Sequence, residues 1–242
     1  MIRSLSKMAS STTTTAAVVT SSARLSEDVL SFWFREAHEE LVQHPQKDLS
    51  LDKSLFGLWF QGGLDTDQKI TQKFKDSIRQ VYDGEHDKNL GHSPTGVLSM
   101  IIVLDQFTRN VYRNTPEMFG FDDKGLEWAK IALERRYDKE LHLVHRMFLY
   151  LPFEHSENLA DQEICVAKNK EMMDEAEKNN SVLMMPLLKV SHKYAIDHRD
   201  IIARFNRFPH RNNILGRTST DEEIAFLNDG AETYGVANDN NK

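Results

Sequence analysis

Apolar residues recur at helical spacing along most of the chain. Ile70, Phe74, Ile78 and Tyr82 repeat every four residues, which places them on one face of a helix that closes at Asp83-Gly84. Alternating β-branched strands are absent, so we expect an all-α fold, an array of about eight or nine mostly antiparallel helices. Comparable patterns predict helices over residues 26–41, 51–61, 93–104, 123–133, 139–158, 161–180 and 186–208, and a short last helix from Thr220.

Polar and small residues mark where several of these helices begin and end. Ser26 precedes two acidic residues and is expected to cap the first helix, and Asp122 or Asp123 is expected to cap a later one. Ser93-Pro94 is a cap followed by proline at the first helical position. The helix that it opens is nearly all apolar, so we expect it to be central and buried. Thr220 and Glu223 have the spacing of a capping box.

Composition excludes several classes of protein. The 242 residues carry 30 basic and 37 acidic side chains, a net charge of −7, whereas a general nucleic-acid binder normally has an excess of Lys and Arg. No apolar run approaches the ~18 residues of a membrane span. Cys165 is the only cysteine, so an intramolecular disulfide is impossible, which fits a reducing compartment. Nothing in the sequence calls for a cofactor.

The first 25 residues differ from the rest of the chain. They contain Arg3, Lys7 and Arg24, no acidic residue, and a run of serine and threonine over residues 10–15. This is the composition of a mitochondrial or other organellar transit peptide, and equally of a disordered tail that leaves the protein cytoplasmic. We therefore expect a segment over 1–25, one helical domain over 26–230 and a flexible tail over 231–242.

The first chemically informative string surrounds Asp105. This carboxylate follows five apolar residues on a helix expected to be buried, where an unpaired charge is costly. Arg109 lies one helical turn later, at a spacing that lets the two side chains meet. The pair is either an internal ion pair or part of a binding site.

The second string runs from Arg146 to Glu157. Arg146, Tyr150 and Glu154 follow one another at intervals of one helical turn, although Pro152 is expected to kink or interrupt the helix. Glu154 and His155 form a candidate acid/base pair. A polar helix end is the alternative interpretation. Neither a His-Glu-x-x-His motif nor a cysteine pair accompanies them, so no metal site is predicted.

The third string is rich in arginine. Arg204, Arg207, His210 and Arg211 alternate with phenylalanine and proline, and Arg217 follows shortly before the last helix. Arginine suits carboxylates and phosphates, and the start of a helix favours anions. These residues therefore either hold an anionic ligand or pair with acidic residues of the protein itself. The candidate internal partners are Asp105, Glu154 and Glu157.

Four ordered strings together resemble the family known as domain of unknown function 924, over about residues 25–230. The resemblance implies a tetratricopeptide-like helical array and no established activity. Thr108 stands where the family usually has proline, and Asn114 and Asn206 stand where it has glycine. The four strings are residues 29–34; 104–113; 148–157; and 204–220.

Three functional hypotheses follow from these strings. In the first, the polar residues converge on a pocket for a small anionic metabolite, with His155, Glu154 or His210 as acid or base and the arginines, Asp105 and Tyr150 as ligand-binding groups. In the second, the array is a protein-interaction module with a concave groove, by analogy with its fold. In the third, the polar residues form a buried ion-pair network that specifies the fold.

Overall fold

The computed structural model describes residues 20–230 and 233–234, and every described element is helical. The first helix covers residues 20–34, and a short turn of helix, η1 (Arg35–Ala37), leads from it into α2 (His38–Gln43). Ser26 therefore lies inside a helix and not at its start, which corrects the predicted cap. In the turn of helix before Ser26, Ser22 is buried against the His86 ring, with 2.9 Å between Ser22 Oγ and His86 Nδ1. Residues 1–19 of the predicted leader lie outside the described residues.

Two long helical segments build the wall on which the polar residues sit. The first joins α3 (Lys53–Phe56) to the π-helical η2 (Gly57–Gln61) and stops at Gly62, as predicted. The second begins at the cap Ser93 and runs through α6 (Pro94–Ile101), the π-helical η3 (Ile102–Phe107) and α7 (Thr108–Val111). Its residues from Val97 to Leu104 are buried, which confirms the prediction of a central helix. Along the chain, these two segments are separated by α4 (Leu64–Tyr82) and the short α5 (Asp87–Leu90).

The second half of the chain follows the same periodicity. A 3-10 turn, η4 (Pro116–Phe119), precedes α8 (Asp122–Glu134), and another, η5 (Tyr137–Glu140), precedes α9 (Leu143–Glu154). Phe121 stands at the cap position of α8, because the Asp122 carboxylate pairs with Arg109 and is not used as a cap. Pro152 lies inside α9, which ends two residues later.

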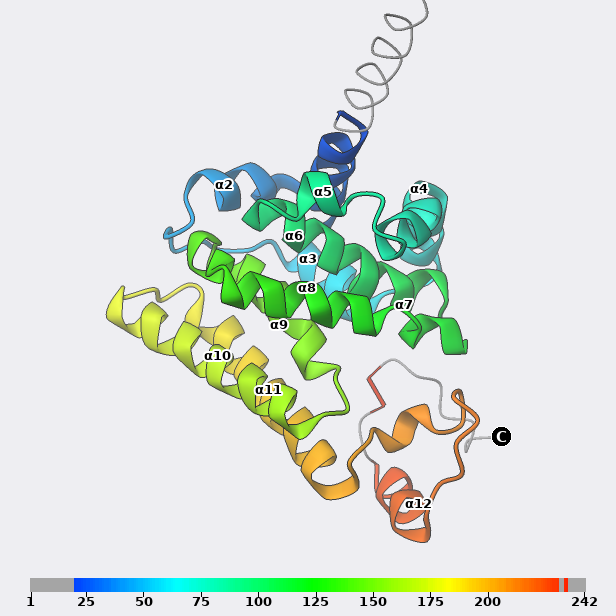
Figure 1. Ribbon diagram of the computed structural model, residues 1–242. Coiled ribbons are helices and arrows are strands. Elements are labelled where there is room, and N and C mark those ends of the chain that lie inside the picture. Colours follow the sequence, from blue (N-terminus) through cyan, green and yellow to red (C-terminus); the bar gives the residue numbers. More distant parts are fainter. Residues whose placement is uncertain (1–19, 231–232, 235–242) are drawn as a thin grey trace, which may run out of the picture.

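The last helices form a separate layer. Helices α10 (Leu159–Lys178) and α11 (Met185–Phe205) pack side by side as an antiparallel hairpin beneath α8 and α9 (Figure 1). The chain then turns through η6 (Pro209–Arg211) to α12 (Asp221–Asn228), whose capping box from Thr220 to Glu223 is present as predicted. The observed helices confirm the all-α fold, and the tetratricopeptide-like detail stays a prediction. No described helix is long and apolar enough to cross a membrane.

Most buried apolar side chains form one continuous core. Trp33, Phe34, Phe107 and Phe148 are almost completely buried and pack edge to face, with ring centroids 5.5 to 5.7 Å apart. A smaller cluster lies at the end of α11, where Phe208 covers Ile201 and Ile202. The C-terminal segment thus has its own small core beside the main one.

Candidate functional site

A cavity of about 820 Å³ lies between the wall formed by η2, η3 and α7 and the helices α9 and α11. Most of its surface is apolar, and we call the part lined by Gln106, Arg109, Glu154 and His155 the polar end. The apolar side chains include Leu51, Phe56, Leu58, Trp59, Phe60, Met147, Phe148, Leu151, Met184, Leu187 and Val190. The polar side chains include Gln61, Gln106, Arg109, Asn110, Arg113, Glu154, His155, Ser191, Tyr194 and His198. Cavities of this size and lining are typical of small-molecule sites.

Both π-helical segments of the described chain lie on the cavity wall. Element η2 contributes Trp59 and Phe60, and η3 contributes Gln106 and the buried Asp105 behind it. A π-helical turn widens the backbone spacing and re-aims side chains, and it is frequent at functional sites. Gly62 ends η2 with φ of +59°, and a Cβ there would lie 3.0 Å from Arg113 Nη2. The glycine therefore lets the chain turn and lets Arg113 pack against it.

Asp105 and His155 form the centre of the polar end. Asp105 is fully buried, and its Oδ1 lies 2.7 Å from His155 Nδ1. Gln106 Nε2 donates to Oδ2 at 2.7 Å, and Arg109 Nη2 lies 3.6 Å from Oδ1. Burial alone would raise the pKa of Asp105, but the charges of His155 and Arg109 hold it well below its usual range. The ionised carboxylate thus fixes Nδ1–H, and Nε2 is the ring nitrogen that a ligand in the cavity can reach.

Glu154 lies beside this pair but in the opposite protonation state. Burial, and then the charge of Asp105, raise the pKa of Glu154 to about 8, so the side chain is mostly protonated at neutral pH. The Cys165 thiol donates to Glu154 Oε2 at 3.8 Å, and His198 Nδ1 lies 3.7 Å from Oε1. Burial lowers the pKa of His198 to about 3, so this ring is neutral at neutral pH. It therefore supplies no positive charge that would stabilise the ionised form of Glu154.

The two arginines that line the cavity already have carboxylate partners. Arg109 donates to both oxygens of Asp122, at 2.8 and 2.9 Å. Arg113 donates to both oxygens of Asp67, at 2.7 and 2.8 Å. Each bidentate pair neutralises its guanidinium, so these side chains supply polarity to the cavity more than net positive charge.

Arg146 and Tyr150 point away from the cavity. Arg146 is buried, donates to the Leu141 carbonyl at 2.9 Å and pairs with Glu175 at 2.5 Å. The Tyr150 hydroxyl lies 3.0 Å from Asp138 Oδ2. Helical geometry explains the separation, because one stripe of α9 contains Met147, Leu151 and Glu154 and faces the cavity, whereas Arg146 and Tyr150 lie on the neighbouring stripe. The structure therefore does not bring these two predicted residues to the site.

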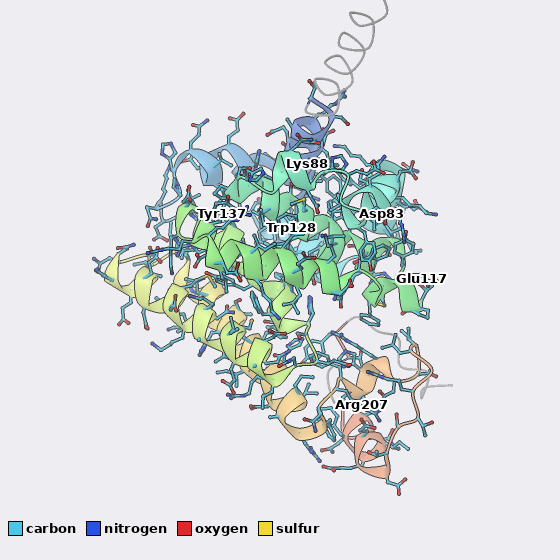
Figure 2. All side chains as sticks on the ribbon, viewed as in Figure 1. Asp83, Lys88, Glu117, Trp128, Tyr137 and Arg207 are labelled. Carbon is cyan, nitrogen blue, oxygen red and sulfur yellow. The ribbon has the colours of Figure 1, made fainter. Side chains whose placement is uncertain are left out.

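The arginine-rich segment pairs chiefly with its own end of the chain. Arg207 donates to both oxygens of Glu223, at 2.6 and 2.7 Å, and Arg204 donates to Glu222 at 2.8 Å. Figure 2 shows Arg207 in the C-terminal segment beside α12. The prediction that Asp105 and Glu154 neutralise this segment is wrong, because Arg204 and Arg207 meet the nearby Glu222 and Glu223, and Asp105 pairs with His155 and Arg109.

Glu157 is the one predicted counter-charge that does contact the segment. It accepts from both terminal nitrogens of Arg217, at 2.7 and 3.0 Å, and from the Phe208 backbone N–H at 2.8 Å. His210 is buried, and burial followed by the charge of Arg211 lowers its pKa to about 2. Its ring is therefore neutral, and it is not among the described residues that line the cavity.

His198, Gln106, Asn110 and Arg113 are cavity residues that sequence reasoning missed. A signal for His198 exists on α11, where Leu187, Ser191, Tyr194 and His198 share one helical face. Polar residues that continue an apolar stripe in this way are typical of a helix that borders a cavity. Within the described residues, no cluster of His, Cys, Asp and Glu is arranged to hold a metal ion.

Comparison with known proteins places the chain in a family. The model of the family described as bacterial protein of unknown function, DUF924, matches residues 29–231. A protein of unknown function from Agrobacterium tumefaciens, ATU0120, has a similar solved structure, with a TM-score of 0.64 and 31% identity. The similarity covers 86% of this chain and 99% of that one. No curated protein matches the chain. The chain therefore belongs to the DUF924 family, as its four sequence strings indicated.

Proposed function

We propose that the cavity binds a small amphipathic molecule and that His155 and Glu154 exchange protons with its polar end. The observation that carries this proposal is the position of His155. Its ring lines the cavity while buried Asp105 holds its Nδ1 at 2.7 Å. A buried carboxylate that orients a histidine toward a cavity is the arrangement used by general bases.

The opposite protonation states of neighbouring groups support an acid/base role. Asp105 is ionised and accepts from His155 Nδ1–H, which leaves Nε2 as the ring nitrogen that can exchange a proton, whereas Glu154 retains its proton up to a pKa of about 8. Environments that push titratable groups apart in this way supply an acid and a base at the same pH. The proposed chemistry is therefore proton transfer to and from the polar group of the ligand.

The lining of the cavity favours an amphipathic ligand over the small anionic metabolite expected from the sequence. Aromatic and aliphatic side chains cover most of the wall, and the arginines there are already paired. Burial of an apolar body against this wall contributes ~25 cal/mol per Å² of apolar surface removed from water. A ligand with an apolar body of moderate length and one polar group matches a cavity that has an apolar wall and a polar end.

The interaction-module hypothesis has less support. Thr233 and Tyr234, from the C-terminal end of this same chain, line the cavity, and the Tyr234 ring lies 4.0 Å from the His198 ring. The chain's own C-terminal residues thus form part of the lining that a bound peptide would have to contact. The ion-pair hypothesis is well supported for Arg204, Arg207 and Arg217. It does not account for His155 and Glu154, because these side chains line a cavity.

Binding of octanol and octanoate, followed by calorimetry and by the ring-nitrogen NMR signals of His155, tests the proposal. We expect at least one probe to bind and to shift the Nε2 signal, while Nδ1 stays protonated by its bond to Asp105. His155→Asn identifies the signal. Val190→Trp, at the half-exposed edge of the cavity, should weaken binding, whereas Ile224→Trp on α12 should not. Binding that ignores Val190→Trp, or that leaves Nε2 unchanged, would contradict the proposal.

A further inference from the structure

Arg211 is a buried arginine without a hydrogen-bonded partner in the described part of the chain. Only 7% of the residue is exposed, and its Nε has no acceptor. The guanidinium lies between two aromatic rings, 4.6 Å from the Phe119 centroid and 4.3 Å from the Phe208 centroid. The nearest carboxylate oxygen, Asp122 Oδ2, lies 3.9 Å from Nη1. Aromatic faces stabilise a cation, but they do not satisfy the N–H donors along its edge.

The carboxylates around Arg211 are engaged elsewhere. Both Asp122 oxygens accept from Arg109, and both Glu157 oxygens accept from Arg217. Burial lowers the pKa of Arg211 to about 10, because Asp122 compensates only partly and Arg109 repels. The Nε of Arg217 and the Nδ1 of His210 are also buried without partners. Buried polar atoms without partners thus gather around Arg211, whereas Arg204 and Arg207 have carboxylate partners.

Arg211 adjoins the polar end of the cavity through Asp122. Asp122 lies between Arg211 and the cavity residue Arg109, and Phe119, which covers the Arg211 guanidinium, directly follows the cavity residue Met118. A negatively charged group would supply the acceptor that the edge of Arg211 lacks. Planar guanidinium edges suit the paired oxygens of carboxylate and phosphate.

We propose that Arg211 is the anchor of an oxyanion site, for a phosphate or a carboxylate group, next to the cavity. The site does not depend on the proposed acid/base chemistry of His155. The anion is either a free ion or the charged end of the molecule that occupies the cavity. The buried Phe208 ring and the half-buried Phe119 ring limit the access of water to the guanidinium, which strengthens the attraction.

Phosphate, acetate and octyl phosphate are suitable probes, with thermal unfolding and calorimetry as readouts. We expect phosphate or acetate to raise the Tm of the wild type and of Arg204→Met, a control that removes an exposed, already paired arginine from the same segment. Arg211→Met, which retains an apolar side chain between the two rings, should lose at least tenfold in affinity. If the anion is the head of the cavity ligand, octyl phosphate binds more tightly than phosphate and Val190→Trp removes that gain.

A measurement on the unaltered protein covers the case in which Arg211→Met does not fold. The guanidinium NMR signals of Arg211 should shift on addition of phosphate, whereas those of Arg204 should not. Equal anion affinity in the wild type and Arg211→Met, or no response of Arg211 to any of the three probes, would overturn the proposal. Phosphate binding that survives His155→Asn and Val190→Trp would leave this site standing even where the proposed function fails.

Discussion

The polar end of the cavity and the C-terminal arginine segment use the same kinds of residue in different surroundings. At the cavity, Asp105 is fully buried and Glu154 is nearly so. In the C-terminal segment, the side chains of Arg204 and Glu222 are more than half exposed. Water screens the exposed Arg204–Glu222 pair and not the buried carboxylates, so charges perturb one another more strongly at the cavity than in that exposed pair. Burial, and not the density of charged residues, separates the candidate site from the structural pairs.

Arg211 is the exception that sharpens this contrast. It belongs to the arginine segment by sequence, but it is buried as deeply as the cavity residues. Its neighbour Arg207 has a bidentate carboxylate, whereas Arg211 has two aromatic rings and a carboxylate oxygen at 3.9 Å. Arg207 and Arg211 are four positions apart in the sequence, and the fold places a hydrogen-bonded carboxylate beside only the first.

Replacement of Asp105 by alanine should have the largest effect. The change leaves His155 without its carboxylate partner and leaves Arg109 with Asp122 alone, beside the buried position of residue 105. Breaking a buried pair costs ~3–5 kcal/mol of the free energy of unfolding. Urea denaturation measures the loss, and Asp105→Asn, which keeps the volume and one acceptor, should lose less. A loss below ~1 kcal/mol in Asp105→Ala would show that this end is as weakly coupled as a surface pair.

Glu154→Gln should change how stability depends on pH. The pKa of Glu154 is about 8 in the folded protein against an ordinary value of 4.5, so the folded state holds a proton that the unfolded state has lost between these values. Stability therefore falls as the pH rises through this window, by up to ~1.4 kcal/mol per pH unit, and levels off above it.

The glutamine variant retains a neutral side chain of the same shape and has no such slope. Urea denaturation of both proteins from about pH 5 to about pH 8 should therefore show the variant gaining on the wild type as the pH rises. Parallel curves would mean that Glu154 titrates like an exposed carboxylate, and the contrast between the two regions would disappear.

The sequence predicted the frame well because local rules determine it. Ser93-Pro94, the Thr220–Glu223 capping box and the stop at Gly62 all act within a few residues, and all three are present in the structure. The burial of the apolar run that ends at Leu104 could be predicted from its composition alone. The caps predicted at Ser26 and Asp122 were wrong, and both places involve a contact with a distant residue, His86 in one case and Arg109 in the other.

The candidate site was only half predictable. Asp105 was expected to pair with Arg109, and its shorter contact is with His155, 50 residues away in the sequence, which no spacing rule reveals. Arg146 and Tyr150 were grouped with Glu154 because they are one turn apart. The count of 3.6 residues per turn moves them onto a neighbouring stripe of α9 that faces Asp138 and Glu175. The cavity itself depends on how closely α9 and α11 pack against η2. This packing distance is set by contacts between distant parts of the chain, so a local sequence pattern does not predict it.

The smallest losses of stability should come from replacing arginines of the C-terminal ion pairs. Among these, the loss should be larger where the partner carboxylate is more buried. Arg204→Ala removes an exposed pair and should change the free energy of unfolding by less than ~0.5 kcal/mol. Arg207→Ala should lower the Tm more, because Glu223, whose side chain is 3% exposed, loses both of its hydrogen bonds from Arg207.

Acid should erase the difference between these two variants. Hydrogen bonds from Arg207 lower the pKa of Glu223 to about 2, against an ordinary value of 4.5. The stabilisation that they provide is therefore present above 4.5 and is lost as the pH falls toward 2. Thermal unfolding of the wild type and both variants across this range should show the Arg207→Ala deficit shrinking, while Arg204→Ala stays close to the wild type throughout. A deficit in Arg207→Ala that is unchanged by acid would instead assign the role of Arg207 to its bond with the Thr218 carbonyl, at 3.0 Å, which does not titrate.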